Sequence, residues 1–207
     1  MTARAEWLEV AGDPSVWRSL GLVVDEDGFI PLMGTSVRVE TQAESGATGI
    51  VGWALSGVDA GQHGDIDGIA TTAVDPRPPT FAHHELGASG LDHVVVMTAD
   101  LERTSRAIEA STGAELKRIR EVGAMRQGFH RLGRGGLIVE LVSRPEMPDG
   151  PARFWGLVIN VDDLDAACER IGPDRVSAPK DAVQPGRRIA TIGSEVGLGL
   201  PVALMTT

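Results

Sequence analysis

The stretch GLDHVVVMTADLE, residues 90–102, decides the fold. It predicts a strand over residues 91–97, because β-branched side chains dominate LDHVVVM. A helix follows, for which Thr98 or Asp100 can supply the side-chain oxygen that caps the first N–H groups, and Gly113 can end it. His93 near the head of this apolar strand is either an ordinary histidine or a ligand on the inner face of a sheet.

Three more strand-like runs follow the helix, at residues 114–122, 124–133 and 135–143, and complete one β-α-β-β-β unit. The unit repeats at an offset of 63 residues. Asp100-Leu101 matches Asp163-Leu164 at the helix starts, and GLIVELVS (136–143) matches GLPVALMT (199–206) at the last strands. The sequence therefore predicts paired modules over 91–207, one at 91–144 and one at 153–207.

The N-terminal part is a weaker copy of the same pattern. Residues 1–73 are predicted to form a degenerate β-α-β-β-β-like region, with the start of a further module at 49–59. The segment 74–90 carries three prolines and is interpreted as a linker. The expected fold class is α+β, with repeated βαβββ modules that form cup-shaped antiparallel or mixed sheets and carry their helices outside.

Charge and composition limit the function classes. The net charge is −10, with 13 Asp/Glu against 4 Lys/Arg in residues 1–90 and 16 against 15 in residues 91–207. This argues against a nucleic-acid groove, which needs a basic stripe, and permits either a cationic small ligand or a solvated acidic face. The single Cys168 excludes an intrachain disulfide. No apolar run of membrane-spanning length and no signal peptide are found, so a soluble cytoplasmic protein is expected.

The paired modules that open with LDHVVV and ADL and close with IVELV resemble the vicinal oxygen chelate superfamily. This superfamily includes glyoxalase I, bleomycin-resistance proteins, extradiol dioxygenases and methylmalonyl-CoA epimerase. The resemblance implies cups that can each hold one divalent metal ion, through His and Glu side chains on the first and last strands of the modules. It also implies a homodimer.

Carried over by position, the resemblance makes His93 and Glu140 metal ligands. The second module departs from the pattern, because the offset of 63 puts Gly156 opposite His93 and Ala203 opposite Glu140. His130 on a neighbouring strand could complete the set, and His63, His83 and His84 are weaker candidates. The ion would be Zn, Ni, Mn or Fe, or the site has lost its metal.

Strand parity makes Glu140 the residue that most needs an explanation. In an alternating strand it shares a face with Ile138 and Val142, and a carboxylate in an apolar row needs a metal, a base or its own proton. Glu140 is therefore either the relic of a metal site or a general base that acts on a ligand. Gln127, Phe129 and Trp155 are candidate walls of the ligand pocket.

Two functions follow from this pattern. The first is a glyoxalase- or dioxygenase-like enzyme, a lyase, isomerase or oxygenase that acts on a small molecule through a reduced metal site or through Glu140 as base. The second is a metal-free protein that binds and sequesters a small molecule, as the bleomycin-resistance proteins do. Both have a small-molecule partner and neither involves nucleic acid or a membrane.

Overall fold

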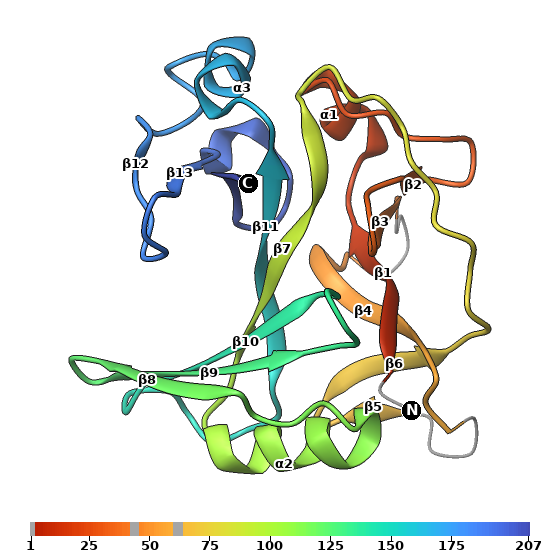
Figure 1. Ribbon diagram of the computed structural model, residues 1–207, viewed down its shortest axis with the longest axis vertical. Helices are drawn as coiled ribbons and strands as arrows, with labels where there is room; N and C mark the ends of the chain where they lie inside the picture. Colours follow the sequence, from red (N-terminus) through yellow and green to blue (C-terminus); the bar gives the residue numbers. More distant parts are fainter. Residues whose placement is uncertain (1–2, 42–45, 60–63) are drawn as a thin grey trace.

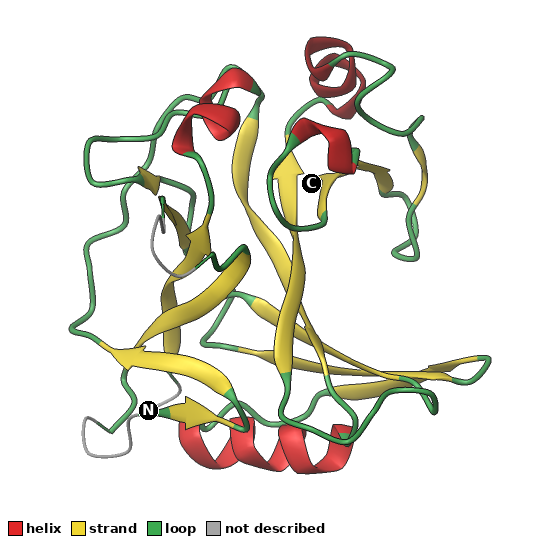
Figure 2. Ribbon diagram, turned by 180° about the vertical axis from the view of Figure 1, so that it is seen from behind, coloured by secondary structure: helices red, strands yellow, loops and turns green. Residues whose placement is uncertain are grey.

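The computed structural model describes residues 3–41, 46–59 and 64–207, and its strands form two curved sheets (Figures 1 and 2). The first sheet has the order β2-β3-β1-β4-β6-β5. Its elements are β1 (Arg4–Ala11), α1 (Pro14–Ser19), β2 (Phe29–Ile30), β3 (Ser36–Glu40), β4 (Gly49–Ser56), β5 (Asp65–Ile66) and β6 (Ile69–Ala73).

The second sheet has the order β12-β13-β14-β11-β7-β10-β9-β8. It contains two consecutive βαβββ modules, so the predicted α+β class is confirmed. The first module comprises β7 (Ala88–Met97), α2 (Leu101–Thr112), β8 (Arg118–Val122), β9 (Met125–Arg131) and β10 (Ile138–Ser143). The second comprises β11 (Arg153–Val161), α3 (Leu164–Ile171), β12 (Lys180–Asp181), β13 (Arg188–Thr191), a 3-10 turn (Ser194–Val196) and β14 (Val202–Thr206).

The helices begin and end where their capping residues predict. Asp100 accepts a hydrogen bond from the Arg103 N–H at the start of α2, and Asp163 accepts one from the Ala166 N–H at the start of α3. Gly113 ends α2 in the left-handed conformation, which favours glycine. Of the two proposed caps for α2, Asp100 is therefore the one used.

Strand register confirms the 63-residue repeat. Val94 of β7 pairs with Val139 of β10, and Leu157 of β11 pairs with Val202 of β14. Both members of the first pair lie 63 residues before those of the second, because 157 − 94 and 202 − 139 are both 63. The two modules therefore correspond at the 63-residue offset over these parallel strand pairs, with β7 and β11 antiparallel at the centre. The outer strands do not keep this offset, because Glu140 pairs with Phe129 whereas Ala203 pairs with Thr191, which is 62 residues after Phe129.

The first sheet follows the same plan in shortened form. β1 pairs parallel with β3 and antiparallel with β4, as β7 does with β10 and β11, and β4 pairs parallel with β6, as β11 does with β14. The outer strands β2 and β5 are two residues long, and no described residue between β4 and β5 is helical.

The segment before β7 packs on the first sheet. His84 is 2 % exposed, accepts a hydrogen bond from the Val23 N–H at Nδ1 and donates from Nε2 to the Pro31 carbonyl. The strand β7 begins at Ala88, earlier than the predicted residue 91. One core cluster of buried side chains draws on both sheets. In the described part of the chain, no helix has the length and apolar character needed to cross a membrane.

Candidate functional site

The concave face of the second sheet encloses a cavity of about 380 Å³. In Figure 1 the end strands β8, β9, β12 and β13 project to the same side of β7 and β11, which gives the sheet its cup shape. Most of the lining is apolar and comes from both modules: Val95, Met97, Met125, Val142, Trp155, Leu157, Val158, Ile189, Pro201, Val202 and Ala203. Polar side chains enter this apolar cup from His93, Gln127, Glu140, Arg144 and Thr191.

His93 and Glu140 meet on this face. His93 Nε2 lies 3.3 Å from Glu140 Oε2, and both side chains are about nine-tenths buried, at 13 % and 12 % exposure. Gln127 Nε2 donates to Glu140 Oε1 at 2.5 Å, while its amide oxygen is buried without a hydrogen-bond partner among the described residues. The parity prediction that placed His93 and Glu140 among apolar neighbours matches this geometry.

A β-bulge adds Asp92 to the site. Leu91 pairs with Ile159 and His93 with Val158, which leaves Asp92 unpaired in this ladder. Because the bulge breaks the alternation of the strand, Asp92 and His93 can both reach the concave side. Asp92 Oδ2 lies 2.7 Å from His93 Nδ1.

Arg187 binds the carboxylate oxygen of Asp92 that does not face His93. Its Nη1 donates to Asp92 Oδ1 and its Nη2 to Asn160 Oδ1, both at 2.5 Å. Burial of Asp92 raises its pKa, but the hydrogen bonds from His93 and Arg187 outweigh this and hold the pKa at about 2. Asp92 is therefore a carboxylate at neutral pH and accepts a hydrogen bond from His93 Nδ1–H, which leaves Nε2 of that ring facing Glu140.

Glu140 has the opposite electrostatic environment. Burial raises its pKa above the usual value, and the partial compensation comes from His93, the Gln127 hydrogen bond and Arg120. His93 Nε2, at 3.3 Å, is the neighbouring group with which the Glu140 carboxyl group can exchange a proton. This arrangement suits proton transfer, because a poised acid and base lie side by side at a cavity wall.

Of the three predicted pocket residues, two line the cavity and one does not. Gln127 and Trp155 line the cavity, and Trp155 is 51 % exposed at its mouth. Phe129 pairs with Glu140 across the ladder and shares its face, but it lies outside the cavity lining and stacks under Arg118.

The prediction that His130 completes a ligand set does not fit its position. His130 is 1 % exposed on the opposite face of β9, where Nδ1 donates to the Ala114 carbonyl, and burial lowers its pKa. His84 binds backbone groups of the N-terminal part through both ring nitrogens, so it does not contribute to the ligand set either. His63 lies outside the described residues.

The implied metal ion can be tested against the available donors. A separation of 3.3 Å between Nε2 and Oε2 would let His93 and Glu140 bind one ion, since metal–ligand bonds are about 2.0–2.2 Å. The equivalent positions of the second module are Gly156 and Ala203, which offer no donor. Among the described residues, no three His, Cys, Asp or Glu side chains gather as a metal site. The donor set does not fit a catalytic site with three protein ligands.

The first sheet has the same positions but different side chains. Glu6 is bulged as Asp92 is, Trp7 takes the place of His93, and Arg38 opposite Phe29 takes the place of Glu140 opposite Phe129. This equivalence follows only from strand register, since no short motif in the sequence is shared between the two sites.

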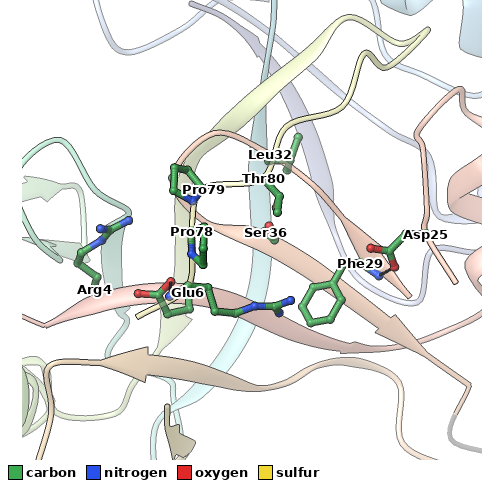
Figure 3. A pocket seen from close by; sticks show the side chains of 11 residues that line it. Arg4, Glu6, Asp25, Phe29, Leu32, Ser36, Pro78, Pro79 and Thr80 are labelled. Carbon is green, nitrogen blue, oxygen red and sulfur yellow. Dashed lines mark hydrogen bonds between the residues drawn. The ribbon is translucent and has the colours of Figure 1, made fainter. Parts of the chain in front are cut away.

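The hollow of the first sheet is filled by the chain itself. The Arg77 guanidinium lies 4.3 Å from the Phe29 ring centroid and 5.3 Å from that of Trp7, and the backbone N–H of Arg77 donates to the buried Glu6 carboxylate. Pro78 and Pro79 cross the same region (Figure 3), and about 40 Å³ of space is left. The cup of the second sheet is therefore the candidate functional site.

Comparisons with known protein families and solved structures support the fold described above. A sequence model of the Glyoxalase/Bleomycin resistance protein/Dioxygenase superfamily matches residues 90–188. This match confirms the vicinal oxygen chelate resemblance for that part of the chain. No curated protein sequence matches the chain.

Two solved structures share the fold at low sequence identity. Methylmalonyl-CoA epimerase from Mycobacterium tuberculosis is 19 % identical, with 60 % of this chain and 92 % of that chain covered and a TM-score of 0.51. A mutant of 4-hydroxymandelate synthase from Streptomyces coelicolor is 17 % identical, with 100 % of this chain and 93 % of that chain covered and a TM-score of 0.65. At these identities the likeness concerns the fold alone.

Proposed function

We propose that the cup of the second sheet binds a small, largely apolar carbonyl compound and that Glu140 and His93 move a proton on it. The observation that carries the proposal is a buried carboxylate of raised pKa, 3.3 Å from a histidine, at the wall of a cavity of about 380 Å³. A carboxyl group whose pKa is shifted towards neutrality is suited to general acid–base catalysis.

The proton balance of the proposed step uses the ionised form of the pair. The Glu140 carboxylate takes a proton from the carbon next to the carbonyl group, and the His93 imidazolium gives its Nε2 proton to the developing oxyanion. The pair ends as Glu140 acid and neutral His93, and the substrate as an enol. Reversal of both transfers at the same carbon and face returns the substrate with an exchanged proton. Delivery of the Glu140 proton to the opposite face gives the epimer, and delivery to another carbon gives an isomer.

Asp92 and Arg187 would act by positioning. The Asp92 carboxylate accepts the hydrogen bond from His93 Nδ1–H and so orients the ring with Nε2 towards Glu140, and Arg187 helps to keep the pKa of Asp92 low. No step is assigned to a metal ion, because only His93 and Glu140 are placed to bind one, whereas a catalytic site usually has three protein ligands. The oxygens of Asp92 are bound by His93 Nδ1 and Arg187.

Hydrogen–deuterium exchange tests the proposal. Ketones and 2-oxo acids with an aryl or alkyl body that fits the cavity, such as 4-phenylbutan-2-one and 4-phenyl-2-oxobutanoate, are incubated in D2O and followed by NMR. The protein should accelerate exchange next to the carbonyl group of at least one, and Glu140→Gln should remove that acceleration. Undiminished exchange with Glu140→Gln would reject Glu140 as the base.

A metal-free binding protein is the second candidate. It is favoured because the cup is apolar and because Gly156 and Ala203 stand in the second module where the first module has His93 and Glu140. Tight binding of a compound without exchange or turnover, with only a modest change of affinity in Glu140→Gln, would support binding over catalysis.

A further inference from the structure

The concave face of the second sheet has a charge opposite to that of the whole chain. The chain carries a net charge of −10. Cross-strand partners in a ladder share a face, so the register assigns each charged strand residue to the cup or to the outside. Glu140 lies on the cup face. Phe129 pairs with Glu140, and Arg118 of β8 pairs with Phe129, so both of these side chains lie on the cup face as well.

The cations on this face come from both modules. Arg120 pairs with Gln127, Arg131 with Ile138, and Lys180 with Ile189, while Arg144 lines the cavity itself. Arg153 pairs with Met97, which also lines the cavity, so the cations on the cup side are Arg118, Arg120, Arg131, Arg144, Arg153, Lys180 and Arg187. The carboxylates on the same side of these strands are Asp92 and Glu140.

Their ion pairs distinguish the two faces. On the outer face, Arg126 pairs with Glu102 of α2 and Arg188 with Asp165 of α3. On the cup face, Arg187 pairs with Asp92. The remaining cup-side cations form no ion pair with any residue that the structure describes: Arg118, Arg120, Arg131, Arg144, Arg153 and Lys180.

The two carboxylates do not neutralise this face. Asp92 is matched by Arg187, and burial shifts Glu140 towards its neutral acid. An excess of positive charge therefore surrounds an apolar cavity in an acidic protein. Concave sites with charge of one sign focus the field on ligands of the opposite sign. Arginine also binds carboxylate and phosphate through two parallel hydrogen bonds.

We propose that the ligand of this cup is an anion, with an apolar body in the cavity and a carboxylate or phosphate group at its cationic rim, held by Arg144 and Arg120. The inference deepens the proposed function, on whose binding site it rests. It gives the ligand a negative charge, whereas the acidic composition of the chain permits a cationic ligand. Arg144 follows Glu140 by four residues, so at about 3.3 Å per strand residue its backbone lies roughly 13 Å from that of Glu140. Arg120 acts electrostatically on the Glu140 carboxyl group itself.

A series of naphthalene derivatives with one apolar body tests the charge preference by isothermal titration calorimetry. The probes are 1-naphthaleneacetate, 1-naphthyl phosphate, the neutral 2-(1-naphthyl)ethanol and the cation 1-naphthylmethylammonium. At least one anion should bind about tenfold or more tightly than the cation, and its affinity should fall between 50 mM and 500 mM NaCl, because salt screens exposed charges. The acetate and phosphate arms decide which anion is preferred.

Single substitutions of arginine test which side chains bind the anion. Arg144→Gln and Arg120→Gln should each weaken the favoured anion by about three- to tenfold, the range of one charge-assisted hydrogen bond at a partly exposed site. Arg126→Gln, on the outer face of the adjacent strand, is the matched control and should leave the affinity within about twofold. Glu140→Gln should retain the anion preference, since the preference does not depend on proton transfer.

The outcomes separate the two proposals. Equal or tighter binding of the cation, or an anion affinity insensitive to both arginine substitutions, would overturn the anionic ligand while the cup remained a binding site. Binding of no probe would overturn both. Anion preference with no exchange activity for any carbonyl compound would leave the ligand class standing and reject the catalytic role of Glu140.

Discussion

Gly156 occupies in the second module the position that His93 occupies in the first, and the Pro201 carbonyl oxygen closes that position to any side chain. A Cβ at residue 156 would lie 2.5 Å from this oxygen and 3.1 Å from the Pro201 Cβ. The loss of a ligand at this position is therefore built into the packing of β11 against the segment that leads into β14.

Gly156→Ala should lower the free energy of unfolding by about 1–3 kcal/mol, since a methyl group forced against backbone must displace it. Denaturant unfolding measures the change. Gly150→Ala is the control, because a Cβ there meets nothing within 4 Å and should have little effect. Equal stability of the Gly156→Ala variant and the wild type would show that the Pro201 segment moves away freely.

Ala203→Glu should create a divalent metal site, because residue 203 matches Glu140 in the repeat and lines the same cavity. The variant would have three donors in the cavity, namely His93, Glu140 and the new carboxylate, and catalytic metal ions usually have three protein ligands. Calorimetric titration with Mn, Ni or Zn should show a gain of about tenfold or more over the wild type, with Ala203→Gln as the control. About one equivalent of metal in wild-type protein purified without chelator, lost in His93→Ala, would instead reveal a third donor.

Glu140→Gln should become more stable relative to the wild type as the pH rises from 5 to 8. The pKa of Glu140 is raised in the folded state, so its contribution to stability is full below the unfolded pKa and is lost as the pH rises through the folded one. Glutamine does not titrate and shows no such loss. The check is the difference in unfolding free energy at the two pH values, and a constant difference would mean that burial does not disfavour the charged form.

Asp92→Asn should lose roughly 2–3 kcal/mol of stability at pH 7. The pKa of Asp92 is lowered from 3.8 to about 2, a difference of about 1.8 units at about 1.4 kcal/mol each. A lowered pKa stabilises the fold above the unfolded value, so the gap between wild type and variant should narrow as the pH falls from 4 towards 2. Asp174→Asn, at an exposed position, is the control and should show little change at either pH.

Several parts of the fold were accessible from local sequence signals. The capping aspartates Asp100 and Asp163 predicted both helix starts, and the 63-residue offset predicted the matching register of the parallel strand pair in each module. The same offset predicted that Gly156 and Ala203 leave the second module without ligands. These signals are readable because helix caps and strand alternation act over a few residues and recur at fixed spacing.

The positions of His130 and His84 were not accessible in the same way. Each ring is buried against backbone groups of a segment distant in the sequence, Ala114 for His130 and Val23 and Pro31 for His84. No local pattern distinguishes such a histidine from a metal ligand, because the distinction depends on which face of which sheet is covered.

By itself the sequence determined the paired βαβββ modules and the placement of His93 and Glu140 on a common face, since both follow from period-two alternation within short strands. Only the tertiary structure decided the chemistry around them. The bulge at Asp92, the Arg187 that reaches it from 95 residues away, and the gathering of unpaired arginines on the cup face all depend on long-range strand pairing. Pairing register between distant strands fixes which charges share a low-dielectric cavity, and that shared environment sets the protonation of Glu140.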